Sequence, residues 1–392
     1  MTPPVDWLTR LVAFDTTSHR SNLDLIDCVA DELRRHGVEP VLFPHEQAND
    51  VRKANLFATF PARDGRTTGG VVLSGHTDVV PVEGQDWDSD PFTVTESAGR
   101  LYGRGTADMK GFLAVIMSRL EAIAAADLAD PLHLAFSYDE EVGLLGAQRM
   151  IDGFGEHGIT ADSCIVGEPT GMRVVRGHKS INLFSVRFRG VAAHSSLTPQ
   201  GVNAIHYAGR FIDFYRRLAE QWRSDGPFDE AYPVAFTTGG VNLVSGGIAG
   251  NTVPDACELE FEFRALGTVD TAPVVERIRA FLFEELEPQM QAEHESAGFD
   301  LVVKAQGPGL ETDPDAAIAA LAEACGGHRT DGKVTYGTEA GIFHNAGIET
   351  VVCGPGEIAV AHAANEYVEL EQLEACGAFL DALIVKLGQG RA

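Results

Sequence analysis

Short apolar runs that each end in a histidine or an acidic residue recur along this sequence, and this recurrence most constrains the fold. The runs cover residues 71–73, 132–138 and 164–166, and they are followed by His76 and Asp78, by Asp139-Glu140-Glu141, and by Glu168. Such β-branched and apolar runs are typical of buried parallel strands. The carboxyl ends of parallel strands meet at one edge of an α/β sheet, so we expect these side chains to share a site.

The spacing of His76 and Asp78 suits a metal ligand with a supporting acid. In extended backbone, residues i and i+2 point to the same side. His76 can therefore direct one ring nitrogen to a metal ion while the Asp78 carboxylate accepts from the other ring N–H, as is usual for ligating histidines. One His-x-Asp alone is more typical of a solvated strand end, so the metal interpretation depends on the recurrence of the pattern.

Further candidates follow at other helix and strand ends. Asp108 precedes an apolar segment from 112 to about 126 that is predicted to be a helix, where it is either a cap or a ligand favoured by the helix dipole. Glu140 and Glu141 are adjacent, and adjacent side chains diverge in extended backbone, so one can ligate while the other faces a substrate. A solvated acidic loop is the alternative. His362 comes shortly after another apolar run that starts at Glu349.

The middle of the chain has a different pattern and predicts a second domain. The chain has 392 residues, which is long for one core. Within 180–306, apolar residues alternate with polar ones, as in half-buried antiparallel sheet. Two expected helices interleave with the strands to give a β-α-β-β-α-β order. We therefore expect a lid and dimerisation domain at 180–306, inserted into a metal-binding catalytic domain formed by 1–179 and 307–392. The expected helices lie at 5–16, 21–36, 202–222, 271–290, 314–325 and 369–388.

Composition excludes some partners. The formal net charge of −27 argues against nucleic acid or an anionic membrane surface. Six cysteines are scattered without a Cys-x-x-Cys pair, which predicts reduced thiols. The first residues lack the basic and apolar segments of a signal peptide, and no apolar run reaches transmembrane length. We expect a cytoplasmic protein that acts on a small molecule.

The candidate residues form a ligand set with a defined chemistry. Two histidines and three carboxylates without a cysteine suit zinc, or manganese or cobalt. Five ligands exceed the three protein ligands of a single catalytic zinc, but they fit two ions about 3.5–4 Å apart if one carboxylate bridges. A spare carboxylate can then act as general base for a water shared by the two ions and return the proton to a leaving amine. This arrangement predicts amide hydrolysis.

Four motifs in order resemble one known family. They are Ser74-Gly75-His76-Thr77-Asp78-Val79-Val80-Pro81, Gly103-Arg104-Gly105-Thr106-Ala107-Asp108-Met109-Lys110-Gly111, Asp139-Glu140-Glu141 and Gly167-Glu168-Pro169-Thr170. They are similar to the two-zinc amidohydrolases that include acetylornithine deacetylase and succinyl-diaminopimelate desuccinylase. Within that family, three further segments look most like the acetylornithine deacetylases: Thr338-Glu339-Ala340, Gly354-Pro355-Gly356, and Ala361-His362 followed by Asn365-Glu366-Tyr367.

The resemblance implies a role for each candidate. It places His76 and Glu168 on one metal ion and Glu141 and His362 on the other, with Asp108 as the bridge. Asp78 would orient His76, and Glu140 would be the general base. The resemblance also implies a cis non-proline peptide bond after Asp108 and a mostly parallel, zinc-exopeptidase-like catalytic domain with a ferredoxin-like α+β lid.

Three residues of the expected lid resemble family residues that act on the substrate. His194 looks like the histidine that crosses a homodimer interface to stabilise the oxyanion, although a polar loop after a strand is the alternative. Asn251 matches an asparagine near the substrate. Arg264 matches an arginine that grips a substrate carboxylate, a task suited to its planar fork. Salt bridges with the glutamates at 258, 260 and 262 are the alternative for Arg264.

These inferences lead to a predicted activity. The protein would hydrolyse N2-acetyl-L-ornithine to L-ornithine and acetate, a step of arginine biosynthesis. A succinyl-diaminopimelate desuccinylase, another N-acyl-amino-acid deacylase and a dipeptidase are alternatives, because the same metal centre serves all of them. A non-catalytic metal-binding dimerisation module is a different class of function. The presence of Glu140 beside all five ligands disfavours it.

Overall fold

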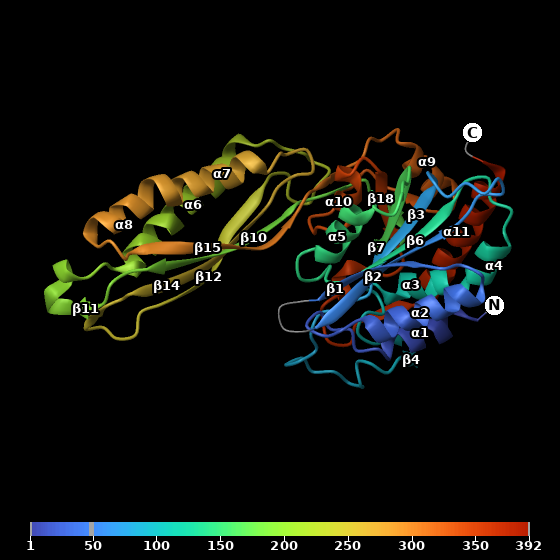
Figure 1. Cartoon of the computed structure of the whole chain (residues 1–392), viewed down its shortest axis with the longest axis horizontal. Helices are drawn as coiled ribbons and strands as arrows, with labels where there is room; N and C mark the ends of the chain where they lie inside the picture. The colour runs from blue at the N-terminus through green and yellow to red at the C-terminus, as the bar shows by residue number, and fades with distance from the viewer. Residues whose placement is uncertain (1, 47–50, 391–392) are drawn as a thin grey trace. The chain divides into compact units, whose positions relative to one another are not determined.

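The computed structural model describes residues 2–46 and 51–390, which form two compact units (Figure 1). The first unit comprises 1–177, 310–332 and 338–392, and the second comprises 178–309 and 333–337. Of the residues predicted to lie in the catalytic domain, 178–179 and 307–309 fall in the second unit, at the predicted boundaries. The segment 333–337 is also predicted to lie in the catalytic domain. In the structure this segment belongs to the second unit, because Val334 forms a bridge with His178 and its carbonyl accepts a hydrogen bond of 3.3 Å from the Lys179 amide.

The first unit is built on a mostly parallel sheet, as expected. Its strand order is β1-β2-β6-β3-β7-β18. Neighbours among β6, β3, β7 and β18 pair in parallel, whereas β2 is antiparallel to both of its neighbours. The strands are β1 (Val41–Glu46), β2 (Arg52–Phe60), β3 (Val71–His76), β6 (Leu132–Ser137), β7 (Ser163–Pro169) and β18 (Glu349–Gly354). Every residue of β3, β6 and β7 is buried, which explains their continuous apolar runs.

Helices cover both faces of this sheet. One face packs against helices that share a single hydrophobic core with the strands: α1 (Pro4–Val12), α2 (Leu23–Arg35), α3 (Lys110–Ser118), α4 (Leu120–Ala125), α9 (Ala317–Ala324) and α11 (Leu370–Gln389). Alternate strand residues point to the opposite face. There Phe57 contacts Phe154 at the end of α5 (Leu145–Gly153), and α10 (Ala340–Asn345) lies beside α5. Helices α5 and α10 are not among those expected from the sequence.

A small three-stranded sheet lies in the same unit. Its order is β19-β5-β4, formed by β19 (Tyr367–Glu369), β5 (Arg100–Tyr102) and β4 (Thr95–Ser97). In its antiparallel pairing, Tyr367 lies opposite Tyr102. The segment that follows β5 and the segment that precedes β19 therefore run side by side. These segments carry Asp108 and His362, respectively.

The second unit has the β-α-β-β-α-β order that the sequence predicts. Its sheet has the order β12-β14-β10-β15, with all neighbours antiparallel. Helix α6 (Ala204–Asp225) and the continuous helical segment of α7 (Ala272–Ala280), η2 (Phe281–Leu286) and α8 (Glu287–Glu293) share a core with this sheet. The strands are β10 (Ile181–Arg189), β12 (Thr238–Gly246), β14 (Ala256–Arg264) and β15 (Gly298–Gly307).

Short elements complete the two units. In the first they are β8 (Arg173–Val174), β16 (Leu310–Glu311), β17 (His328–Arg329) and η3 (Ile358–Val360), and in the second β11 (Ala193–His194), η1 (Ser195–Gln200) and β13 (Thr252–Val253). Strand β9 (Gly177–His178) lies at the boundary between the two. All six cysteines are buried with free thiols. Among the described residues, we find no helix with the length and apolar character needed to cross a membrane.

Candidate metal centre

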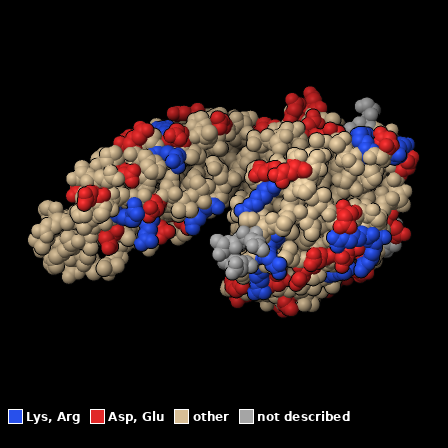
Figure 2. Space-filling view, in the orientation of Figure 1, with Lys and Arg blue, Asp and Glu red and all other residues tan. Residues whose placement is uncertain are grey.

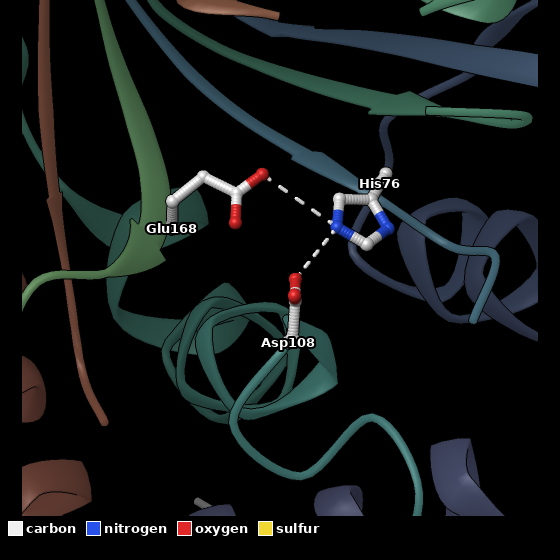
Figure 3. A group of neighbouring side chains, drawn as sticks. All are labelled: His76, Asp108 and Glu168. Carbon is white, nitrogen blue, oxygen red and sulfur yellow. Dashed lines mark hydrogen bonds and ion pairs between the residues drawn. The ribbon is translucent and has the colours of Figure 1, made fainter. Parts of the chain in front are cut away.

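Three side chains far apart in the sequence meet beside the carboxyl ends of β3 and β7 (Figure 3). His76 is the last residue of β3, Glu168 lies in β7, and Asp108 lies two residues before the start of α3. His76 Nε2 lies 3.0 Å from Asp108 Oδ1 and 3.6 Å from Glu168 Oε1. All three residues are buried, and one potential ligand atom from each lies within 4.8 Å of the other two. The first group of expected ligands is therefore assembled.

A second group shares Asp108 with the first. His362 Nε2 lies 3.3 Å from Asp108 Oδ2 and 3.0 Å from Glu141 Oε2. Asp108 thus directs one carboxylate oxygen to His76 and the other to His362. This is the geometry required of a bridging carboxylate. The N-cap of α3 is Met109, and no side chain makes a capping hydrogen bond there. The alternative that Asp108 caps this helix is therefore wrong. The peptide bond between Asp108 and Met109 is cis.

Asp78 lies beside His76, but its backbone carbonyl is closer to the histidine ring than its carboxylate is. His76 Nδ1 lies 2.9 Å from the backbone carbonyl of Asp78 but 3.6 Å from its carboxylate, so the carbonyl is the hydrogen-bond acceptor. The carboxylate accepts instead from the Ser18 hydroxyl at 2.7 Å and from the backbone N–H groups of Glu140 and Glu141 at 3.1 and 3.3 Å. Because these three donors occupy its oxygens, Asp78 fixes the acidic loop as well as the histidine.

The three consecutive acids after β6 diverge, as their adjacency predicts. Asp139, whose φ is +53°, pairs with the buried ammonium of Lys53, which also donates to the Ser18 carbonyl. Glu141 turns to His362. The carboxylate of Glu140 makes no hydrogen bond or ion pair with another residue in the part of the chain that the structure describes. Glu140 is thus the one acid of the three that is left available for a substrate.

The electrostatics of the cluster favour a positive charge inside it. Burial is the main cause that raises the pKa of Glu140 and Glu168 well above the ordinary glutamate range, and neighbouring carboxylates contribute. Burial, followed by the charge of Asp108, raises the pKa of Glu141 to about 7. Burial acts to raise the pKa of Asp108 as well. Hydrogen bonds from His362 and His76 outweigh burial, however, so the pKa of Asp108 is lowered. Carboxylates held together away from water are stabilised by cations, so these residues fit divalent metal ions.

Further residues support the ligands without having been predicted. Glu339 is fully buried and accepts hydrogen bonds from Ser74 on β3 at 2.7 Å and from Ser137 on β6 at 2.6 Å, which ties together the two strands that end at the site. The charge of Lys53 inside the apolar strand β2 was the available signal for its buried ion pair. Glu339 stands out only through the family resemblance, because nothing near it in the sequence indicates its two serine partners.

The second unit holds the other three expected residues. His194 and Asn251 lie near one another there, because β11 pairs with β13 and the Ser195 amide donates to the Asn251 carbonyl at 2.9 Å. His194 is exposed, and its Nδ1 lies 2.8 Å from the Ser196 hydroxyl. Arg264 forms an ion pair of 3.1 Å with Glu262 on its own strand. Arg264 therefore forms a salt bridge with one of the neighbouring glutamates, which was the alternative to substrate binding.

Comparisons with known proteins show which family the chain belongs to. Residues 72–386 match peptidase family M20/M25/M40. The acetylornithine deacetylase of Myxococcus xanthus is 37% identical over 390 residues, covering 98% of this chain and 97% of that protein, and the acetylornithine deacetylase of Pasteurella multocida is 32% identical over 378 residues, covering 95% and 93%. A Bacillus subtilis structure described as a dinuclear metal-binding peptidase of the M20 family aligns with a TM-score of 0.66 at 14% identity, covering 97% of this chain and 96% of that one. The chain therefore belongs to peptidase family M20/M25/M40 and is a metal-dependent hydrolase.

Proposed function

We propose that the protein hydrolyses the amide bond of an N-acyl amino acid, with N2-acetyl-L-ornithine as the preferred substrate and L-ornithine and acetate as products. The observation that carries this proposal is the pair of ligand groups that share Asp108, with the uncommitted carboxylate of Glu140 beside them. Two groups with one bridge suit two divalent ions. A neighbouring unpaired acid suits proton transfer.

In the proposed reaction, each residue of the first unit has one task. His76 and Glu168 would hold one ion, Glu141 and His362 would hold the other, and Asp108 would be shared by both. When bound, the ions supply a Lewis acid for the amide carbonyl and lower the pKa of a water molecule. Glu140 takes the proton of the attacking water as the new C–O bond forms. It returns that proton to the nitrogen as the C–N bond breaks, so that the amine leaves neutral.

The substrate side of the proposal rests on the relatives and on charge. The two curated relatives described above are both acetylornithine deacetylases that match over nearly their full length. The net charge of −27 also suits a substrate whose side chain carries an ammonium group. In this proposal Asn251 and Arg264 contact the substrate, Arg264 exchanging Glu262 for the substrate carboxylate. The metal is zinc, with cobalt or manganese as substitutes.

The proposal includes a homodimer formed through the second unit, with His194 of the partner subunit stabilising the oxyanion. Strand β12 is an edge strand, paired in the described residues only with β14. Its outer half exposes Leu243 and Val244 by 61% and 62%, and Ile248 beyond it is 85% exposed. Figure 2 shows few charged side chains at the end of the second unit that carries β11. Uncharged edge strands with exposed apolar residues favour pairing between chains.

A hydrolysis panel tests the activity. The purified protein would be loaded with Zn²⁺, Co²⁺ or Mn²⁺ and assayed with N2-acetyl-L-ornithine, N-succinyl-diaminopimelate, other N-acetyl amino acids and dipeptides. We expect the highest kcat/KM for N2-acetyl-L-ornithine. Faster turnover of the succinyl substrate would identify a desuccinylase. No hydrolysis of any amide with any of the three metals would favour a non-catalytic metal-binding module.

Light scattering after size exclusion tests the dimer. We expect the wild-type protein to elute with twice the mass of one chain and the Leu243→Asp/Val244→Asp variant to elute as a monomer. Val385→Asp is the matched control, because Val385 is 59% exposed but lies on α11 of the first unit. A wild-type monomer at micromolar concentration would contradict the dimer.

A further inference from the structure

The turn that carries His362 has an unusual backbone and a buried acid at its end. His362 and Asn365 both have left-handed φ values, +61° and +58°, which non-glycine residues adopt only where the surroundings support them. The His362 side chain is 53% exposed, so packing around the ring does not fix the turn. Glu366, which closes the turn before β19, is only 1% exposed.

Glu366 binds the segment that carries Asp108. Its Oε1 accepts hydrogen bonds from the backbone N–H groups of Ala107 at 2.9 Å and Asp108 at 3.0 Å. Its Oε2 accepts from the Gly105 N–H at 3.0 Å and from Arg104 Nη1 at 2.7 Å. Both oxygens are thus saturated by four donors from residues 104–108. A carboxylate is the side chain best suited to accept this many hydrogen bonds, because it has no donor of its own.

The segment has the conformation that this binding requires. Gly105 has a φ of +81°, and a Cβ atom there would lie 2.7 Å from the Val79 side chain. The backbone N–H groups of 105, 107 and 108 consequently converge on one point, as in the anion-binding nests formed by successive amides. In this protein the anion is the side chain of Glu366 rather than a ligand.

Arg104 extends the connection to the other side of the turn. Its guanidinium donates to the Ala363 carbonyl at 3.3 Å and to Gln85 Oε1 at 2.5 Å. Gln85 in turn donates from Nε2 to the His362 carbonyl at 2.8 Å. Arg104 and Glu366 are both 1% exposed, so this is a buried ion pair.

We propose that Glu366 is a positioning residue that sets the distance between the bridging carboxylate of Asp108 and His362, and thereby determines whether the centre can hold its second metal ion. One end of the connection is the backbone N–H of Asp108 itself, and the other end is four residues after His362. Loss of the connection would leave His76, Glu168 and Asp108 together but would free the turn that brings His362. This inference rests on the proposed two-ion site.

Metal titration of paired variants tests the inference without using the hydrolytic activity. Metal-free Glu366→Gln and the control Glu369→Gln would be titrated with Co²⁺, followed by calorimetry and by visible absorption. Glu369 makes the same kind of contact, an ion pair of 3.2 Å with Arg100, but is 46% exposed and bonds no ligand segment. Removal of a residue that orients ligands typically weakens metal binding about 10–100-fold.

We expect Glu366→Gln to keep the affinity of the first Co²⁺ and to weaken the second by about 10–100-fold. Glu369→Gln should bind both ions as the wild-type protein does. A purely structural role would lower the melting temperature of Glu366→Gln while leaving both affinities unchanged, and that result would overturn the inference. Failure of the hydrolysis panel would leave the titration intact, so the two proposals fail separately.

Hydrogen exchange on the wild-type protein covers the case in which Glu366→Gln does not fold. In the metal-free protein, peptides spanning residues 103–109 should retain at least three slowly exchanging amides, since Glu366 accepts from three of them. Fast exchange of this segment in the folded, metal-free protein would show that Glu366 does not hold it, and would overturn the inference.

Discussion

The two halves of the metal centre are built differently. The strand half consists of His76 and Glu168, which come from buried parallel strands and are at most 4% exposed. The turn half consists of Glu141 and His362, and the His362 side chain is 53% exposed on a turn with left-handed backbone. Asp108 belongs to both. Sheet packing therefore positions one half, whereas a few buried polar contacts position the other.

This difference teaches where such a site is robust and where it is adjustable. Strand ends are held by a ladder of backbone hydrogen bonds and a continuous core, so a single substitution nearby shifts them little. The turn depends on Glu366, Arg104 and Gln85, which are joined to it by individual hydrogen bonds. Removal of one of these contacts should therefore affect the turn half selectively.

The largest effect on activity is expected for Glu140→Ala. Both halves of the site should still bind metal in this variant. Loss of a general base typically costs about 10²–10⁴-fold in rate, so we expect a decrease of that size in kcat for N2-acetyl-L-ornithine. Elemental analysis should still find two ions per chain. Glu96→Ala, at an exposed position on β4, is the control. Loss of metal with retained activity would contradict the assigned roles.

The next effect concerns the ion pair beneath the acidic loop. Lys53 and Asp139 are at most 1% exposed, and removal of one partner from a buried pair typically costs about 3–5 kcal/mol. We expect Lys53→Met to lower the free energy of unfolding by this amount in urea titrations. Arg20→Met, which breaks an exposed pair with Asp15, should cost less than about 1 kcal/mol. Equal losses in the two variants would show that burial does not distinguish these pairs.

A comparison of His76 with His362 tests whether the strand half and the turn half of the site differ in how they are held. In metal-free protein, His76→Ala should lower the free energy of unfolding by about 1–3 kcal/mol, because it leaves buried partners unpaired. His362→Ala should lower it by less than His76→Ala does, because the His362 side chain is 53% exposed and water can replace part of its contacts with Asp108 and Glu141. Chemical unfolding of both variants in the presence of a chelator measures this. Similar losses would mean that the turn half is as integral to the core as the strand half.

The smallest effect is expected for Gln85→Ala. This change removes the hydrogen bond from Arg104 as well as the one to the His362 carbonyl, but only the latter acts on the turn directly, and a single hydrogen bond contributes about 0.5–1.5 kcal/mol. We expect the affinity for the second Co²⁺ to decrease by roughly 2–10-fold, with the first unchanged. Calorimetric titration measures both affinities. A weaker first ion would place Gln85 in the support of the strand half instead.

Much of the strand half could be predicted from the sequence. The continuous apolar runs before His76 and Glu168 identified buried strands, and parallel strands necessarily bring their carboxyl ends together. The divergence of Glu140 and Glu141 also followed from backbone geometry alone. In the second unit, alternation of apolar and polar residues predicted the antiparallel sheet. These features are local, so a short window of sequence contains their cause.

The partners of the supporting residues could not be predicted in this way. His76 is hydrogen-bonded to the Asp78 carbonyl rather than to its carboxylate, because Ser18 and two loop amides take the carboxylate oxygens. Likewise, residues 333–337 pack with the second unit, where Val334 bridges to His178 and Lys333 forms an ion pair of 2.7 Å with Asp229. In each case the nearest acceptor or partner is set by a segment distant in the chain.

The sequence by itself determined which residues stand at strand and helix ends and that their chemistry suits divalent cations, since backbone periodicity and side-chain type are properties of each segment alone. Only the tertiary structure decided that Asp108 faces both histidines and that Glu366 binds its segment from 258 positions away. The physical reason is that hydrogen bonds reach only about 3 Å, so partners are chosen after β5 and β19 pair and bring the two segments side by side.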